Sequence, residues 1–145
     1  MGLQLTRGSE YGIRAMMYLA GRPFGEICSL REVSSAQDVP ESFLAKIFQS
    51  LVHAGIVVSH RGARGGFALA RPAEEITPAQ VIEAVDGPIA LNHCVVWPES
   101  CGNSPDCRMH EVWTTAQTAV LDVLSETSFA ELVCEPAEQR EGRPV

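Results

Sequence analysis

Residues 40–70 read PESFLAKIFQSLVHAGIVVSHRGARGGFALA, and this stretch decides the fold. Its first part is opened by Pro40, repeats apolar residues at helical spacing and stops at Gly55, which predicts a helix with one broad buried face. Its second part has short apolar runs at residues 56–60 and 67–70 on either side of the glycine-rich tip RGARGG, which predicts a β-hairpin. The apolar stripe of the helix comprises Phe43, Leu44, Ile47, Phe48, Leu51 and Val52.

The chain just before this stretch supplies a shorter helix. Ser29 followed by Glu32 is a capping box, and the helix that it opens runs to about residue 37. The turn DVP at residues 38–40 follows at once and leads into the longer helix. Ordinary helical hairpins share this pattern, but a helix-turn-helix followed directly by a β-hairpin is a winged helix. We therefore predict a mainly α fold with a small β-hairpin wing, a winged helix-turn-helix.

This fold predicts where the protein would meet DNA. The second helix of such a module lies in the major groove with its amino-terminal residues at the base edges, and here these include Ser42, Lys46 and Gln49. The wing tip carries Arg61 and Arg64 among glycines that allow close approach to phosphate or to a minor groove. The alternative for the two arginines is a solvated hairpin tip, and the adjacent helix-turn-helix favours DNA contact.

The charge distribution agrees with a DNA-binding amino-terminal half. The chain has 145 residues and a net charge of −7, which by itself argues against nucleic acid. Residues 1–71, however, contain eight Lys or Arg against five Asp or Glu, whereas residues 72–145 contain three against thirteen. The basic half is therefore the part that can face phosphate.

The composition is that of a globular protein, with 46% hydrophobic and 20% charged residues. We find no apolar run long enough to span a membrane and no apolar core of a signal peptide, so we expect a cytoplasmic protein without a membrane partner. In a reducing cytoplasm, clustered cysteines more often bind metal or sense redox state than form static disulfides.

Three of the five cysteines and one histidine fall within residues 94–110. Proline, glycine and asparagine between them favour turns, so that several side chains can point inward. The candidate ligands are Cys94, Cys101, Cys107 and His110, a donor set that suits an iron-sulfur cluster or tetrahedral zinc. A disulfide with one spare thiol is the alternative, which the odd count disfavours. Cys28 and Cys134 lie far from this loop and are interpreted as buried apolar thiols.

The segments that flank this core of motifs are predicted to be helical. Residues 9–20 have one buried face, with Glu10 in the first turn, where a carboxylate complements the helix dipole. Thr77, Pro78 and Gln80 form a cap, a first-turn proline and a capping partner for a helix that leads to the cysteine loop.

The helix behind the loop has an apolar seam whose residues step by four and three, as in a helix that packs along another helix. The seam comprises Met109, Trp113, Ala116, Val120 and Val123. It is either internal core or a dimer interface, and we favour the dimer because a winged helix that reads a palindrome needs a symmetric partner. Ser128 with Glu131 caps a last short helix. We expect a DNA-binding domain over residues 1–72, a cluster loop and dimerisation helix over 73–134, and a disordered tail over 135–145.

With these motifs in place, the chain resembles the Rrf-type family of bacterial iron-sulfur winged-helix transcription regulators, the group that contains IscR, NsrR and RirA. The resemblance rests on the wing RGARGG, on VIEAVDG at residues 81–87 and on the three loop cysteines, and it extends from LTR at residues 5–7 to ELV at residues 131–133. It implies a homodimer with a long crossed helix and a palindromic double-stranded DNA operator. It also implies a cluster that changes DNA affinity with iron supply, oxygen, redox state or nitric oxide.

The resemblance offers two candidates for the fourth ligand. His110 matches the position of the IscR-like histidine, whereas Glu10 matches the place from which NsrR-like members reach an acidic ligand across the dimer. We favour His110, because imidazole is a known cluster ligand, and we favour a 2Fe-2S over a 4Fe-4S cluster. Two positions depart from the family pattern: Arg64 replaces a common wing glycine and adds charge, and Ala45 replaces an acidic residue linked in IscR-like members to choosing between DNA site classes.

As a mechanism, a bound cluster would fix the loop and thereby the relative placement of the two recognition helices. The sequence leaves open whether the loaded or the empty form binds DNA. The alternatives are an iron-sulfur electron carrier, which has no use for a winged helix, and a zinc- or thiol-based DNA-binding regulator. We do not expect an enzyme, because no cysteine or serine is paired with a base and an acid in a recognisable constellation.

Overall fold

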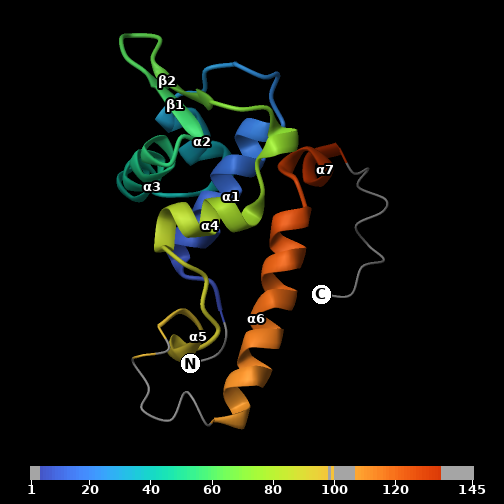
Figure 1. The fold of residues 1–145 in the computed structure, drawn as a ribbon. Coiled ribbons are helices and arrows are strands. Elements are labelled where there is room, and N and C mark those ends of the chain that lie inside the picture. Colours follow the sequence, from blue (N-terminus) through green and yellow to red (C-terminus); the bar gives the residue numbers. More distant parts are fainter. Residues whose placement is uncertain (1–3, 98, 100–106, 135–145) are drawn as a thin grey trace.

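The computed structural model describes residues 4–97, 99 and 107–134. In this part of the chain, helices and one two-stranded antiparallel hairpin form the fold (Figure 1), which confirms the predicted mainly α architecture with a β wing. Figure 1 shows a helical body that carries the hairpin at one end, while the long helix α6 runs from beside α5 up to the body near α4 and α7, so that much of α6 extends beyond the body.

The first three helices begin and end as their caps dictate. Helix α1, Arg7–Ala20, starts two residues earlier than predicted, because the Thr6 hydroxyl caps it by accepting the backbone N–H of Ser9. The Ser29 hydroxyl likewise caps α2, Leu30–Gln37. Asp38 then adopts a left-handed conformation with φ of 53°, which makes the tight turn into α3, Glu41–His53.

The wing consists of β1, Val57–His60, paired with β2, Gly66–Leu69, close to the predicted bounds. The sequence did not predict a third segment at its base. Cys28 exchanges two backbone hydrogen bonds with Phe67, each 2.8 Å long. A Cβ atom on Gly66 would lie 2.2 Å from the carbonyl oxygen of Cys28, so this position requires glycine. The loop before α2 is thereby attached to the wing.

The hydrophobic core joins the helices to the hairpin through aromatic stacking. Phe48 of α3 is fully buried and stacks on Phe67 of β2, with ring centroids 4.2 Å apart. Phe43 is the exception to the predicted stripe, because it is 53% exposed. Phe43 lies in the first turn of α3. Among the described residues its ring makes one aromatic contact, edge-on with Tyr11 of α1, with the ring centroids 6.2 Å apart. The apolar stripe of α3 is wider at this first turn than the surface that α1 covers. The prediction that Phe43 is buried was therefore wrong.

The 3₁₀ turn η1, Ala73–Glu75, leads to α4, Pro78–Asp86. The predicted capping box of α4 is present, because the Thr77 hydroxyl accepts from the backbone of Gln80 and the Gln80 amide oxygen accepts from the backbone of Thr77. Helix α4 packs against α1 and α3. It comes close to α1 at Gly12, where a Cβ atom would meet Val85 at 3.2 Å.

The remaining helices are α5, His93–Val96, α6, Arg108–Glu126, and α7, Phe129–Cys134. The hydroxyl of Ser128 accepts the backbone N–H of Glu131, as predicted for the last helix. Helix α7 returns to α1, and the N–H of the buried Phe129 donates to the Ile76 carbonyl at 2.9 Å.

Residues after position 72 thus contribute α4 and α7 to the helical body, and the domain division at residue 72 stays a prediction. The expected tail at residues 135–145 lies outside the described residues. Within the described ranges, no helix combines the length and hydrophobicity that a bilayer span requires.

Candidate DNA-binding surface and cysteine site

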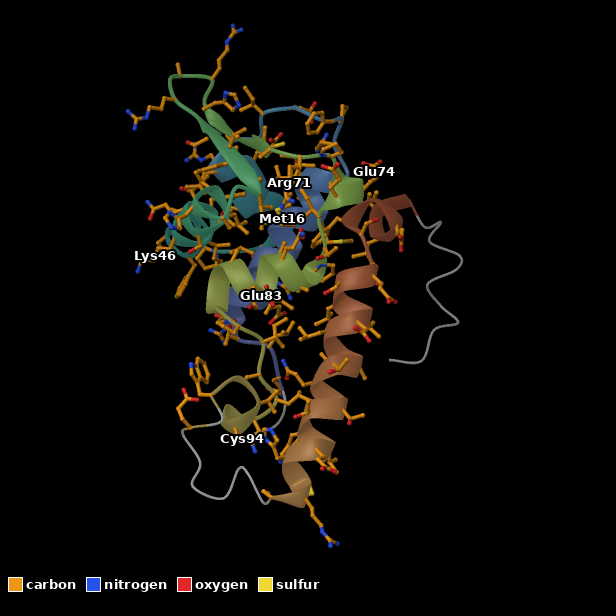
Figure 2. The ribbon with its side chains drawn as sticks, in the orientation of Figure 1. Met16, Lys46, Arg71, Glu74, Glu83 and Cys94 are labelled. Carbon is orange, nitrogen blue, oxygen red and sulfur yellow. The ribbon has the colours of Figure 1, made fainter. Side chains whose placement is uncertain are left out.

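The outer side of α3 presents the predicted recognition residues. Ser42, Lys46 and Gln49 are all exposed, and their spacing places them on one side of the helix. Leu44 and Phe48 are buried on the opposite side. Figure 2 shows Lys46 directed away from the helical body, so the three polar side chains have room to meet a duplex.

The wing tip holds the two predicted arginines, and both are exposed. Its shape depends on glycine: Gly62 has a φ of 108°, and a Cβ atom on Gly65 would lie 2.3 Å from the carbonyl oxygen of His60. The N–H of Gly65 donates to the carbonyl of Gly62 at 3.0 Å and closes the tip. Arg61 and Arg64 are therefore carried at the end of an ordered hairpin.

A shallow hollow lies where α3 meets the wing. Gln49 and His53 of α3 line it together with Ser59 and Phe67 of the hairpin. A concave surface between a recognition helix and a wing suits the convex outline of a duplex. Sequence reasoning missed His53 and Ser59. The available signal was that His53 is a polar residue at the end of the recognition helix and Ser59 is a polar residue within the first wing strand.

The structure brings together the segments that carry three of the four loop candidates. Cys94 lies in α5 with 9% of its surface exposed, whereas Cys107 immediately precedes α6 and His110 lies in its first turn, both half-buried. Helix α5 packs against α6. Cys101 lies outside the described residues, and within those residues no three metal-ligand side chains are gathered. Cys94 lies on the single helical turn of α5. The turn-forming residues predicted between the cysteines, Pro98, Gly102, Asn103 and Pro105, lie outside the described residues.

The start of α6 presents Cys107 at the amino terminus of the helix. Cys107 is the N-cap residue, its side chain makes no capping hydrogen bond, and its carbonyl accepts the N–H of His110 at 3.1 Å. A helix amino terminus carries partial positive charge, which favours an anionic group bound there. Thiolates with an imidazole are the donors that iron-sulfur clusters and zinc take. By donor type, Cys94, Cys107 and His110 therefore fit a cluster or a zinc ion.

Glu10 is engaged on α1. Its carboxylate forms an ion pair with Arg14 at 2.7 Å, on a part of the helix where both side chains are about half exposed. Cys28, in contrast, is fully buried, and burial raises the pKa of its thiol to about 11. The interpretation of Cys28 as a buried apolar thiol is confirmed. The side chain of Cys134 lies outside the described set.

Two polar side chains tie the chain between α4 and Cys94 to its neighbours. The carboxylate of Asp86, the last residue of α4, accepts hydrogen bonds from the hydroxyls of Thr6 and Ser9 at the start of α1. The amide of Gln117 in α6 bonds to the backbone at residues 89 and 91. The connection from the DNA-binding helices to the cysteine site is thus held at both ends.

Comparisons with known proteins agree with this architecture. The family model Rrf2, described as an iron-dependent transcriptional regulator, matches residues 5–135. A protein of Mycobacterium tuberculosis strain H37Rv, named as an HTH-type transcriptional regulator, is 32% identical over 130 residues, which cover 90% of this chain and 81% of that protein.

Three solved structures are also similar. CymR, the global cysteine regulator of B. subtilis, has a TM-score of 0.75 at 27% identity, with 91% of this chain and 97% of CymR covered. IscR of T. potens has a TM-score of 0.75 at 26% identity, with 99% and 96% covered. A transcriptional regulator from Listeria innocua reaches 0.77 at 30% identity, with 100% and 97% covered. The chain therefore belongs to the Rrf2 family and is a winged-helix, HTH-type transcriptional regulator.

Proposed function

We propose that this regulator is a homodimer whose affinity for a palindromic DNA site is controlled by an iron-sulfur cluster. The observation that carries the proposal is the placement of the candidate ligands. Cys94 lies on α5 and Cys107 and His110 lie at the start of α6, two helices that pack together immediately downstream of the DNA-binding body. A cluster that links α5 to α6 would therefore lie where the proposed DNA-binding helices connect to the long helix α6.

In this proposal the DNA contacts are made by α3 and the wing. Lys46, Arg61 and Arg64 would meet phosphates or guanine edges, and Ser42 and Gln49 would meet base edges in the major groove. All five side chains are exposed, and the hollow between α3 and the wing joins the two groups into one surface.

Cys94, Cys101 and Cys107 would hold the cluster, with His110 as the fourth ligand and a 2Fe-2S type favoured. The family description as iron-dependent and the likeness to IscR support iron at this position. A bound cluster would supply a centre that responds to redox state and to iron supply. The chain's own contribution is to keep the thiolates at the positive end of α6 and to restrict solvent at the buried Cys94.

The choice of His110 over Glu10 rests on local geometry. His110 lies in the first turn of α6 and Cys107 is the N-cap residue three positions before it, so the local chain geometry favours both as ligands of one cluster. Glu10 would have to give up its 2.7 Å ion pair with Arg14 and reach the site of another subunit. His110→Ala should therefore alter the visible absorption of the loaded protein, whereas Glu10→Gln should leave it unchanged.

The proposed dimer uses an apolar side of α6 that the single chain leaves uncovered. Met109, Val112 and Val123 are 47%, 55% and 64% exposed. With Ala116 and Ala119 they step by three and four residues, the spacing of a helix-packing seam. Of the seam predicted from the sequence, Trp113, Ala116 and Val120 are half-buried, whereas Met109 and Val123 are exposed. The uncovered side carries two shallow hollows, one on each side of Ala119, into which side chains of a second α6 can pack.

A thiol-based regulator is the second candidate. The similar structures include CymR, described as a cysteine regulator, and its oxidised form from Staphylococcus aureus. Cys94 and Cys107 are free thiols on two helices that pack together, so oxidation is an alternative way of joining them. An iron-free protein whose DNA affinity responds to oxidant would favour this candidate.

The deciding experiment starts with protein purified without oxygen. We expect a coloured protein with stoichiometric iron and sulfide, and a DNA affinity that differs between the loaded and the empty form in fluorescence anisotropy. Cys94→Ala and Cys107→Ala should abolish this difference, while Cys28→Ala, a substitution outside the site, should preserve it. A colourless protein that cannot be reconstituted, or equal affinities of the two forms, would refute cluster control.

A further inference from the structure

Gln117 is an unusual residue for its position, because it lies on the buried side of α6. It is 5% exposed, whereas the neighbouring Thr118 is exposed. Burying an amide is unfavourable unless its donors and acceptors are paired, so the surroundings of Gln117 must supply partners.

The partners are backbone groups of the segment between α4 and α5. The Gln117 amide oxygen accepts the N–H of Leu91 at 2.8 Å, and its amide nitrogen donates to the carbonyl of Ile89. This pair of bonds to alternate residues resembles the contact that an adjacent β-strand would make. The side chain thus fixes both the position and the direction of residues 89–91 against α6.

The position of this contact matters for the cysteine site. Gln117 and His110 are seven residues apart, which is about two turns or 10.5 Å along one side of α6. Cys94 follows Leu91 by three residues, a stretch that reaches at most about 11 Å. Anchoring Leu91 at Gln117 therefore limits how far Cys94 can lie from this side of α6. Figure 2 shows Cys94 beside this end of the helix.

The other end of the same segment is also anchored. Asp86 holds the end of α4 to Thr6 and Ser9 of α1. Residues 87–91 thus form a short segment that is held to α1 at one end through Asp86 and to α6 at the other end through Gln117. Of the two anchors, Gln117 is the one next to Cys94.

We propose that Gln117 is a positioning residue that sets the placement of Cys94 relative to Cys107 and His110, so that the ligand set is prearranged before a metal group binds. This inference rests on the proposed function for its biological meaning, but the prearrangement is a property of the empty protein. Residues that orient ligands without touching the metal typically change metal affinity by about 10–100-fold when replaced.

The test compares two variants of the full chain. Gln117→Leu removes both hydrogen bonds and keeps a side chain of similar size. Gln117→Glu keeps an acceptor for the N–H of Leu91, but its ionised carboxylate provides no donor for the carbonyl of Ile89. Thr118→Val on the exposed side of α6 is the matched control. In the empty, reduced protein, the alkylation rate of each cysteine is followed by peptide mass spectrometry. The buried Cys28 reports on unfolding of the whole domain.

We expect Cys94 to react about tenfold faster in Gln117→Leu, the factor expected for the loss of two hydrogen bonds, while Cys28 remains unreactive. Gln117→Glu should lie between Gln117→Leu and the wild type. With cobalt(II) as a probe of the ligand set, the Gln117→Leu variant should bind about 10–100-fold more weakly, and Thr118→Val should bind like the wild type.

Unchanged Cys94 reactivity and unchanged cobalt affinity in both Gln117 variants would overturn the inference, and so would parallel exposure of Cys94 and Cys28. A wild-type protein that takes up neither cobalt nor a cluster would refute the proposed function. The alkylation comparison would then still decide whether Gln117 places Cys94.

Discussion

Replacing Gly66 with alanine probes the attachment of the wing to the helical body. The new Cβ atom would lie 2.2 Å from the carbonyl oxygen of Cys28 and 2.7 Å from its carbonyl carbon, and both are backbone atoms that cannot rotate away. The segment at Cys28 must withdraw, which breaks its two 2.8 Å hydrogen bonds with Phe67.

The expected cost follows from these contacts. Each lost backbone hydrogen bond contributes about 0.5–1.5 kcal/mol, so the pair contributes about 1–3 kcal/mol. The reduced entropy of the unfolded chain on changing glycine to alanine offsets about 0.4–1 kcal/mol. The free energy of unfolding should therefore fall by about 1–2 kcal/mol, a measurable part of the about 5–15 kcal/mol typical of a domain.

Urea unfolding followed by circular dichroism measures this change, with Gly21→Ala as the control. Gly21 has a φ of −76°, and a Cβ atom there would lie 3.4 Å from its nearest neighbour, so that substitution should be nearly neutral. DNA affinity should also fall in Gly66→Ala, because the displaced wing carries both arginines. An unfolding free energy within about 0.5 kcal/mol of the wild type, together with retained hydrogen-exchange protection at Phe67, would refute the three-segment description of the wing.

Three further predictions concern the thiol, the DNA surface and the dimer. Because burial raises the pKa of Cys28 from 9.0 to about 11, stability should be unaffected by this group below pH 9 and should fall between pH 9.0 and about 11, where the unfolded thiol ionises and the folded one does not. Unfolding curves across this range, compared with those of Cys28→Ala, measure the effect, and parallel curves would contradict it. Arg61→Ala should weaken DNA binding and reduce the slope of log affinity against log salt by about 0.9 if the guanidinium meets a phosphate, and an unchanged slope in an anisotropy titration would exclude that contact. Val112→Asp should shift sedimentation toward monomer, whereas Thr118→Asp on the opposite side of α6 should not; equal behaviour of the two variants would argue against the proposed seam.

The local structure was predictable wherever a residue's partner lies a few positions away. The capping box of Thr77 and Gln80 spans three residues, and the cap of α2 at Ser29 reaches only to Glu32. The hairpin was predictable for the same reason, because its two strands are joined by one glycine-rich turn. The sequence therefore determined the wing and the order of the described α-helices other than α5, and it placed Ser42, Lys46 and Gln49 on one side of α3 by spacing alone.

The tertiary structure decided which residues connect these elements. Cys28 pairs with Phe67 of the wing, Asp86 of α4 bonds to the start of α1, and Gln117 of α6 bonds to the segment before Cys94. In the sequence Gln117 looks like a surface glutamine, and Phe43 looks like core, because hydrophobic spacing reports a helix face but not what covers it. What covers each face depends on how α1, α4 and α6 pack against one another. That packing is set by contacts between residues far apart in the chain, whose pairing no local pattern encodes.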